Sequence, residues 1–255
     1  MPVQNATQRF SSRVGNYARY RPLYPPAVIT LLQNECGLTP DSVIADVASG
    51  TGIFTRLLLE NGNRVFGVEP NAEMRRAGEE YLARFPKFTS VSGTAEATTL
   101  PDHSVELVTA AQAAHWFDRE KARREFVRVL KPDGWAVLVW NERRTDSTPF
   151  LREYETLLLT YGTDYQEVRH ERTTAEISGF FAPSPFGSRA LEMLQEVDYA
   201  GLEGRLLSSS YTPQPDRPTY EPMLRELRRI FDAHRVNDRV TLEYNTLIYW
   251  GELSS

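Results

Sequence analysis

The sequence predicts an α/β fold with a mostly parallel sheet flanked by helices. Two observations predict it. Short apolar segments alternate with amphipathic helical patterns between residues 16 and 141, as in strands joined by helical crossovers. These apolar segments are nearly continuous, which is typical of strands buried on both faces. The length of 255 residues, with 41% hydrophobic and 25% charged residues, suits one large globular domain or one domain with an insertion.

Five strands are expected in the first part of the chain. They are residues 42–48 (SVIADVA), 64–69 (RVFGVE), 87–93 (KFTSVSG), 104–112 (SVELVTAAQ) and 135–141 (WAVLVWN). Right-handed crossovers make such strands parallel, so their carboxyl ends should meet at one edge of the sheet.

Helical patterns lie before and between these strands. They occupy part of residues 16–38 and residues 52–62, 71–85 and 118–134. Residues that favour helix ends support them, namely Pro25 and Pro26 near the first start, Gly37 at its end, Asn71 as an N-cap, and Pro132 and Gly134 after the last helix.

The regular alternation stops after Asn141. Residues 142–168 indicate a loop and a helix, and residues 177–188 (ISGFFAPSPFGS) are irregular and rich in aromatic residues. Strand patterns return at residues 189–200 and 239–253, with an amphipathic helix at 219–234 between them. We therefore expect a core of residues 1–141 and 186–255, interrupted by a small helical cap at 142–185. The N-terminal segment, about residues 12–37, is expected to act as a lid.

Composition excludes several classes of function. A net charge of −5 without a long basic run disfavours binding to nucleic acid. No apolar run is long enough to span a membrane, and the N-terminus lacks a signal-peptide core, so we expect a cytoplasmic protein. The only cysteine, Cys36, sits in an apolar helical stretch as a small core residue, and the four histidines show no metal-ligand spacing. The sequence leaves open whether the protein is a monomer or a homodimer.

A loop of small residues, ASGTG at 48–52, follows the first strand directly. Gly50 and Gly52 have no Cβ, so the backbone there can turn sharply and approach a ligand. Glu69 ends the second strand, where a carboxylate can accept two hydrogen bonds from a ribose diol. Together the two features indicate a nucleoside-containing cofactor. Taken singly, the loop also fits a tight turn between a strand and a helix without a ligand, and Glu69 also fits a solvated acid at the end of a strand.

The details of this loop disfavour a dinucleotide. The pattern G-x-G-x-x-G/A, started at Gly50, places Thr55 at its third position. Asp46, inside the first strand, is also unexpected in that pattern. A buried acid there is better explained by a ligand with a positive group, or by hydrogen bonds to the loop itself.

At this point the sequence resembles the class I S-adenosylmethionine-dependent methyltransferases of the type 11-like, small-molecule group. DVASGTG at 46–52 resembles the first motif, roughly D-x-G-x-G-x-G, with Ala48 in place of its first glycine. SGTAEATTLPDHSVELV at 92–108 resembles the next block, with Thr94 where the family usually has Asp. NYARYRPLYP at 16–25 resembles a segment that folds over the cofactor. The resemblance implies a Rossmann-like, doubly wound, seven-stranded sheet and S-adenosyl-L-methionine as the cofactor.

The resemblance also implies the residues that bind the cofactor. Glu69 matches the ribose-binding acid, Thr94 takes the place of the residue that holds the adenine amino group, and Ala95 would offer its backbone N–H to the ring. The full set of cofactor-binding candidates is Asp46, Ala48, Ser49, Gly50, Gly52, Glu69, Pro70, Met74, Thr94, Ala95, Glu96 and Gln112.

In-line methyl transfer, the reaction that the resemblance implies, needs positioning more than acid–base help. His115 is the catalytic candidate, either as a base for an acceptor proton or as a wall of the pocket. Aromatic faces can stabilise the sulfonium and arginine forks suit a carboxylate acceptor, which makes the substrate candidates Tyr17, Tyr20, Arg21, Trp116 and Arg143. Core packing and surface salt bridges are the simpler explanations of these residues. A small molecule is the expected partner, and no metal site is expected.

Two other functions stay open. A nicotinamide-dependent oxidoreductase would use the same sheet, although Thr55 and the absence of an obvious Tyr-x-x-x-Lys pair beside a serine disfavour it. A noncatalytic protein on this fold would bind S-adenosylmethionine and transfer nothing.

Overall fold

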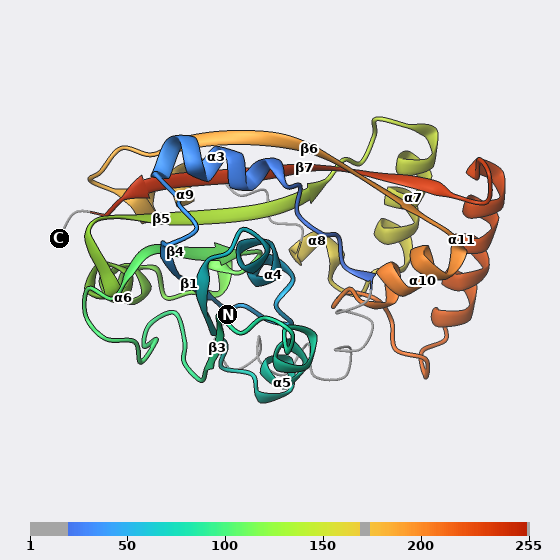
Figure 1. The fold of residues 1–255 in the computed structure, drawn as a ribbon. Helices are drawn as coiled ribbons and strands as arrows, with labels where there is room; N and C mark the ends of the chain where they lie inside the picture. The colour runs from blue at the N-terminus through green and yellow to red at the C-terminus, as the bar shows by residue number, and fades with distance from the viewer. Residues whose placement is uncertain (1–19, 169–173, 254–255) are drawn as a thin grey trace.

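The computed structural model describes residues 20–168 and 174–253. A single seven-stranded sheet in the order β3-β2-β1-β4-β5-β7-β6 runs through the described protein (Figure 1). The first five strands are parallel, and β7 is antiparallel to both of its neighbours. The predicted fold class is confirmed. The strands are β1 (Val43–Val47), β2 (Arg64–Val68), β3 (Phe88–Val91), β4 (Val105–Ala111), β5 (Leu130–Arg143), β6 (Gly187–Val197) and β7 (Val240–Glu252).

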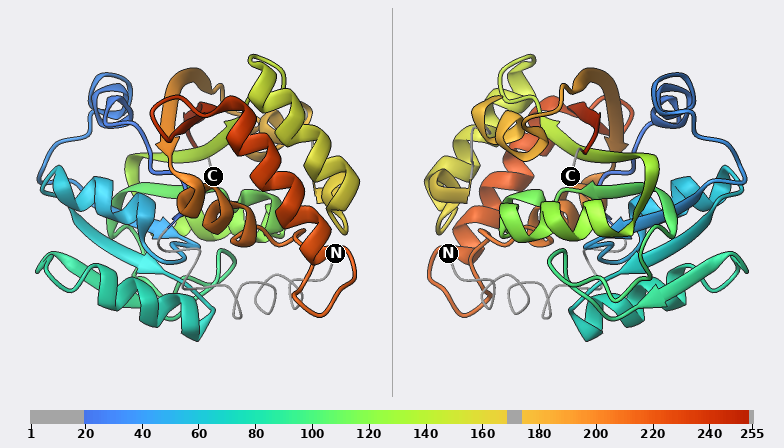
Figure 2. Two further views of the ribbon diagram at one scale, coloured as in Figure 1. Left: turned by 90° about the vertical axis from the view of Figure 1, so that its right-hand side faces the viewer. Right: turned by 90° about the vertical axis from the view of Figure 1, so that its left-hand side faces the viewer.

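Helices cover both faces of the sheet (Figure 2). One face packs against α3 (Ala27–Cys36) and α4 (Ile53–Glu60), and the end of α5 (Ala72–Tyr81) reaches the same cluster. The other face packs against α6 (Arg119–Val129) and α9 (Thr174–Phe181). The strand side chains that meet these helices are fully buried on both sides, which explains the nearly continuous apolar runs of the sequence.

The predicted helix ends are largely confirmed. The side chain of Asn71 accepts hydrogen bonds from the backbone N–H groups of Glu73 and Met74 at the start of α5. Gly37 ends α3 in the left-handed conformation at φ 62°. The end of α6 differs from the prediction, because the helix stops at Val129 and β5 starts at the next residue. Pro132 and Gly134 therefore lie inside the strand rather than beyond the helix.

The sheet changes direction between β1 and β4. The chain adds β2 and β3 on one side of β1, then crosses over to place β4 and β5 on the other. In open sheets of this kind, ligands bind beyond the carboxyl ends of the strands at such a switch point. The ASGTG loop follows β1 directly, so it lies at that point.

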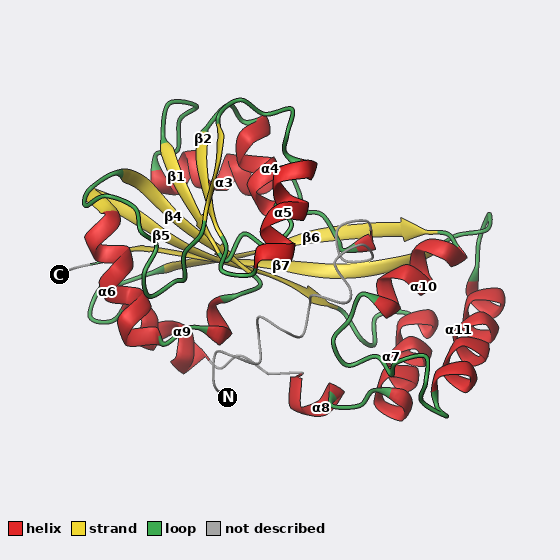
Figure 3. Cartoon of the chain, turned by 90° about the horizontal axis from the view of Figure 1, so that it is seen from below, coloured by secondary structure: helices red, strands yellow, loops and turns green. Residues whose placement is uncertain are grey.

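A helical lobe lies at the far end of the two long strands β6 and β7 (Figures 1 and 3). It is formed by α7 (Pro149–Tyr161), α10 (Tyr199–Leu207) and α11 (Tyr220–His234), which bury a common apolar cluster with the ends of both strands. Because β7 runs antiparallel and pairs Tyr244 with Arg143, this lobe stands at the carboxyl end of β5, on the ligand side of the sheet.

Two helices of the second half were not predicted. Residues 174–181, expected to be irregular in part, form α9, because Phe180 and Phe181 gain burial against the sheet. The strand expected at 189–200 ends at Val197, and α10 follows it, capped by Asp198, which accepts a hydrogen bond from Gly201 N–H at 2.8 Å. The lobe thus combines α7 and a short α8 (Tyr165–Val168) from the expected cap with helices from the expected core. The division into core and cap stays a prediction.

Candidate active site

The ASGTG loop bends through three residues with left-handed backbone. Ala48, Gly50 and Gly52 have φ angles of 55°, 58° and 83°. A Cβ at Gly52 would lie 2.6 Å from the Cδ1 atom of the buried Leu82, so a side chain cannot fit there without a shift. Ala48 takes the same conformation with a Cβ, at the position where the family motif has glycine. The loop therefore presents backbone rather than side chains to the space beyond β1.

Asp46 lies under this loop and is 1% exposed. Its two carboxylate oxygens accept hydrogen bonds from the hydroxyl of Thr55 at 2.5 Å and from the hydroxyl of Thr109 at 2.9 Å. Thr109 is its direct neighbour on β4, and Thr55 comes from the first turns of α4. Burial raises the pKa of Asp46 to about 6, although both hydroxyls oppose the shift. The carboxyl group thus ties β1, β4 and α4 together beneath the loop.

Glu69 joins the loop to the end of β2. One oxygen accepts a hydrogen bond from the backbone N–H of Gly50 at 2.9 Å, and the other accepts one from the backbone N–H of Asn71 at 2.8 Å. The residue is 7% exposed, and burial raises the pKa of its carboxyl group against these two bonds. Each oxygen keeps a further acceptor position, so the carboxylate can still accept hydrogen bonds from a diol.

A cavity of about 110 Å³ opens directly above the loop. Its floor is formed by Asp46 and the loop, and it continues past the ends of β4 and β5 at Gln112 and Asn141 to Arg205 of α10. The side-chain amide of Gln112 donates to the backbone carbonyl of Asn141 at 3.0 Å, which fixes this wall of the cavity. The Thr51 hydroxyl, on a residue that is 1% exposed, has no hydrogen-bond partner among residues 20–168 and 174–253 and belongs to a residue that lines the cavity.

A second, larger cavity of about 520 Å³ is lined in part by the segment that follows β4. His115, Phe117 and Trp140 line it together with residues of α9. His115 belongs to the short 3₁₀ helix η2 (Ala114–Trp116) and is exposed.

Known proteins with similar sequence and structure support this arrangement. Residues 45–138 match a family model described as a methyltransferase domain. The chain is 38% identical over 167 residues to an uncharacterized methyltransferase of Mycobacterium tuberculosis, which covers 66% of this chain and 64% of that protein. It is 34% identical over 165 residues to an uncharacterized methyltransferase-like protein of Schizosaccharomyces pombe, covering 64% and 63% of the two chains. The aligned part therefore spans just under two thirds of the length of both relatives.

A solved structure from Anaeromyxobacter dehalogenans, provisionally assigned as a type II methyltransferase, has a similar fold. It matches with a TM-score of 0.67 and 26% sequence identity over 91% of this chain and 97% of the other. Over residues 45–138 in sequence, and in its fold, the chain is similar to the S-adenosylmethionine-dependent methyltransferases. The resemblance predicted from the motifs is confirmed, and the glycine loop lies at the switch point, within the residues that match the methyltransferase domain.

Five of the twelve predicted cofactor-binding residues lie at the first cavity. Asp46, Ala48, Ser49, Gly50 and Gln112 line it. Met74 packs against the loop, since its Cε atom would lie 3.5 Å from a Cβ at Gly50. Gly52 ends the loop and lies against Leu82. Pro70 is exposed next to Glu69. The roles of these residues stay predictions.

The segment after β3 carries the other cofactor candidates, Thr94, Ala95 and Glu96. A bridge between Thr94 and Ala97 closes a tight turn, and the Thr94 hydroxyl accepts a hydrogen bond from the backbone N–H of Glu96 at 3.3 Å. The carboxylate of Glu96 accepts one from the backbone N–H of Asp118 at 2.9 Å. In this conformation the Thr94 and Glu96 side chains accept hydrogen bonds from backbone N–H groups of the protein. Ala95 between them is buried.

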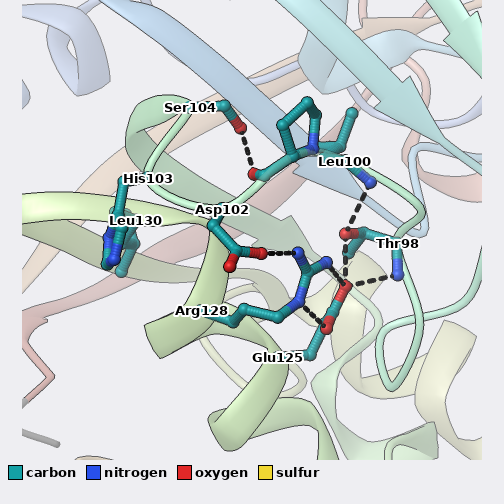
Figure 4. A network of polar contacts seen from close by, with 9 residues as sticks. Thr98, Leu100, Asp102, His103, Ser104, Glu125, Arg128 and Leu130 are labelled. Atoms are coloured by element: carbon teal, nitrogen blue, oxygen red, sulfur yellow. Dashed lines mark hydrogen bonds and ion pairs between the residues drawn. The ribbon is translucent and has the colours of Figure 1, made fainter.

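A polar network holds this segment against α6 (Figure 4). Glu125 accepts hydrogen bonds from the backbone N–H and the hydroxyl of Thr98 at 2.7 and 2.5 Å, and Arg128 binds Glu125 with two N–H groups. Arg128 also pairs with Asp102 at 2.5 Å, and His103 contacts the carbonyl of Leu130 at 2.8 Å. Burial pushes the pKa of Glu125 upward, but the hydrogen bonds from Arg128 and Thr98 outweigh it and lower the pKa. The segment is thus fixed from behind by α6.

The predicted substrate residues are spread over several places. Arg21 lines the first cavity and donates to the carbonyl of Ser208 at 3.1 Å, whereas the ring of Tyr20 packs on Gly204 of α10. The ring of Trp116 contacts that of His115 at a tilt of 44°, with ring centroids 4.8 Å apart, and His115 lines the second cavity. Tyr17 lies outside the described residues.

Arg143 was expected to face an acceptor but is held inside the protein. Its guanidinium pairs with Glu155 at 2.5 Å, donates to the hydroxyl of Tyr165 at 3.2 Å and lies over the ring of Tyr154. Both charged side chains are 10% exposed. These contacts give Arg143 a structural role. The sequence did not reveal them, because α7 and α8, which supply the partners, could not be placed beside β5 from the sequence.

Arg205 was missed by the sequence analysis, although it lines the cavity. It belongs to α10, a helix that the sequence did not reveal. Arg205 lies in the segment EGRLLSSSYTP at 203–213, which resembles the C-terminal part of some members of the family, but this resemblance did not single out the arginine.

Among residues 20–168 and 174–253, no group of three or more His, Cys, Asp or Glu side chains is placed to hold a metal ion. Within the same ranges, no helix is both long and apolar enough to cross a membrane.

Proposed function

We propose that this protein transfers a methyl group from S-adenosylmethionine to a small-molecule acceptor by in-line displacement. The observation that carries the proposal is the Glu69 carboxylate, which is fixed at the end of β2 beside the backbone of Gly50. A buried carboxylate next to a side-chain-free bend suits a ribose diol and the chain that leaves its sugar ring. The similarity of residues 45–138 to a methyltransferase domain supports methyl transfer independently.

The residues around the cavity fit this cofactor. Asp46 at the cavity floor suits a positively charged group. Glu69 would bind the ribose hydroxyls, and the segment at Thr94–Glu96, fixed by Glu125 and Arg128, would hold the adenine.

S-adenosylmethionine supplies the electrophilic methyl group, and the protein supplies position. Holding both reactants in line can lower the barrier by roughly 7–11 kcal/mol in favourable cases. The loop, Gln112 and Asn141 form a fixed wall, and the segment that follows Tyr20 crosses the ends of the strands, where Asn141 donates to the carbonyl of Leu23 at 3.0 Å. We propose that this wall aligns the acceptor and excludes water.

The role of His115 depends on which cavity receives the acceptor. His115 lines the second cavity, which shares no lining residue with the first, so it can take the acceptor's proton only if the acceptor extends into the second cavity. A histidine that accepts the acceptor's proton gives a rate that falls at acidic pH, where the imidazole is protonated, whereas a histidine that only shapes the wall gives no such decrease. Replacement by Gln and a pH profile of both proteins separate the two roles.

Calorimetric titration with S-adenosylhomocysteine tests the cofactor. We expect binding to the wild type and a loss of roughly 10-fold to 100-fold in affinity for Glu69→Gln, because a charged acceptor is lost. Glu73→Gln is the matched control, since Glu73 is an exposed acid on α5, four residues away, and its carboxylate bonds to no described residue. Wild-type protein that binds reduced nicotinamide and not S-adenosylhomocysteine would overturn the proposal.

A second assay tests the transfer itself. Incubation with methyl-labelled S-adenosylmethionine and a panel of small acids, phenols and amines should label at least one acceptor. Binding of the cofactor with no transfer to any acceptor would instead indicate a noncatalytic binding protein.

A further inference from the structure

Arg205 places a cation on the wall of the first cavity. It lies in the last turn of α10, next to Ser208, and lines the same cavity as Gly50, Asp46 and Asn141. The residue is partly exposed, so part of its side chain is accessible to the cavity. An arginine in this position can reach a ligand that occupies the space beyond the loop.

The hydrogen bonds of Arg205 fix its guanidinium group without neutralising it. Nε donates to the hydroxyl of Tyr244 at 3.3 Å, and Nη1 donates to the hydroxyl of Ser209 at 3.1 Å. Nη2 donates to no residue in the described part of the chain. Within residues 20–168 and 174–253, no carboxylate lies within the 4.0 Å that defines an ion pair with this group.

Arg143 and Arg144 differ from Arg205, because each pairs with a carboxylate. Arg143 pairs with Glu155, and Arg144 pairs with Glu192 at 2.5 Å and lies 3.7 Å from Glu243. Arg205 is surrounded instead by the neutral hydroxyls of Tyr154, Tyr211 and Tyr244. The last carbonyls of α10 offset only part of its charge.

A partly buried cation without a counter-ion favours an anionic ligand. Removing a charge from water is costly unless an opposite charge compensates it. A guanidinium whose orientation is already fixed by two hydrogen bonds loses little further freedom when it binds a planar carboxylate with its remaining N–H groups.

We propose that Arg205 forms a carboxylate-binding subsite in the first cavity. This inference rests on the proposed methyl transfer for the identity of its ligand. Two carboxylates can reach the subsite under that function, namely the amino-acid end of the cofactor and an acidic group on the acceptor. Asp46 lines the same cavity, which therefore suits a ligand with a positive and a negative group.

The test uses three variants of the full-length protein. Arg205→Gln removes the charge and keeps a side chain that can bond to Tyr244 and Ser209. Arg205→Lys keeps the charge and removes the fork, so the subsite remains testable if the Gln variant folds poorly. Arg225→Gln is the matched control, because Arg225 is an exposed arginine on the neighbouring α11 with no ion pair to a described residue. Urea unfolding of each variant establishes that it is folded.

Two pairs of probes distinguish the sources of the carboxylate. S-adenosylhomocysteine and 5′-methylthioadenosine differ in the amino-acid end that carries the carboxylate. Benzoate and succinate, titrated into both the free and the S-adenosylhomocysteine-saturated protein, represent acidic acceptors, with benzamide as the neutral comparison.

Either of two results supports the subsite. Arg205→Gln lowers the affinity for S-adenosylhomocysteine by about tenfold or more without changing that for 5′-methylthioadenosine, or it lowers the affinity for benzoate or succinate by a similar factor while S-adenosylhomocysteine binds as before. Arg205→Lys should give a smaller loss. The inference is overturned if Arg205→Gln matches the Arg225→Gln control with every probe.

The outcome also separates this inference from the proposed function. If the wild type binds neither nucleoside, the proposed function fails, and benzoate and succinate still decide whether Arg205 binds a carboxylate.

Discussion

The hydroxyl of Thr55 donates a hydrogen bond of 2.5 Å to the buried carboxylate of Asp46. The sequence presents these two residues as separate departures from a dinucleotide-binding pattern. The structure shows that they are one feature, because the threonine on α4 satisfies the acid that β1 buries. Thr109 completes the arrangement from β4, so the acid beneath the glycine loop has a partner for each oxygen.

This pair predicts a pH-dependent stability. Burial raises the pKa of Asp46 from 3.8 to about 6 in the folded protein. A raised pKa in the folded state stabilises the protein below the unfolded pKa, and this stability is lost as pH rises through about 6. Relative to Asp46→Asn, the wild type should lose about 3 kcal/mol of unfolding free energy between about pH 4 and about pH 7.

Urea unfolding of both proteins across that pH range measures the difference, and other titrating groups cancel because both proteins share them. Two stability curves that run parallel from acid to neutral pH would show that the pKa of Asp46 is not raised.

The sequence predicts the parallel half of the fold well, for a physical reason. Strands buried on both faces must be continuously apolar, so β1, β2, β4 and β5 stand out, and Asn71 and Gly37 mark helix ends through local chemistry. The family motif also places the loop and Glu69 at one site, since they follow the adjacent parallel strands β1 and β2, whose carboxyl ends meet at the same edge of the sheet.

The helical lobe could not be predicted in the same way. The helix α10 contains Gly201 and Gly204, which disfavour helices in isolation, and it forms because Asp198 caps it and its apolar face packs on α11. Whether an arginine meets a carboxylate depends on this packing. From the sequence, Arg143 therefore could not be paired with Glu155, and Arg205 was not singled out as a site residue.

The loop predicts a specific cost for one glycine. Gly52→Ala should destabilise the protein by roughly 1–3 kcal/mol, because its φ of 83° disfavours a side chain and a Cβ would lie 2.6 Å from Leu82. Gly37→Ala is the control, since Gly37 has a φ of 62° but nothing within 4 Å of a Cβ. It should cost about 1 kcal/mol.

Chemical denaturation compares the two variants, and titration with S-adenosylhomocysteine should show weaker binding only for Gly52→Ala. If the two substitutions cost the same, the contact with Leu82 contributes nothing and only the backbone conformation matters.

Arg143 is predicted to stabilise the fold rather than to bind the acceptor. Arg143→Met leaves the carboxylate of Glu155 buried without its cation, which should cost about 3–5 kcal/mol. Arg144→Met is the control and should cost about 1 kcal/mol or less, because its partner Glu192 is exposed. Thermal and urea unfolding measure both. An Arg143→Met protein as stable as the wild type, with weakened binding of benzoate or succinate, would return Arg143 to the substrate site.

The network behind the Thr94–Glu96 segment predicts that a residue far from the cavity affects binding of the adenine. Arg128 reaches both Glu125 and Asp102, and Glu125 in turn holds Thr98, four residues after Thr94 (Figure 4). Arg128→Leu should reduce stability by about 1–2 kcal/mol, a modest value because Arg128 is 36% exposed and solvent screens the pair.

The same substitution should weaken the binding of 5′-methylthioadenosine severalfold, since the segment predicted to hold the adenine loses its support. Arg124→Leu, an exposed position on the same helix, should change neither quantity. Hydrogen exchange would then show faster exchange at residues 94–98 in Arg128→Leu alone. Unchanged nucleoside affinity together with faster exchange would mean that this segment does not contact the adenine.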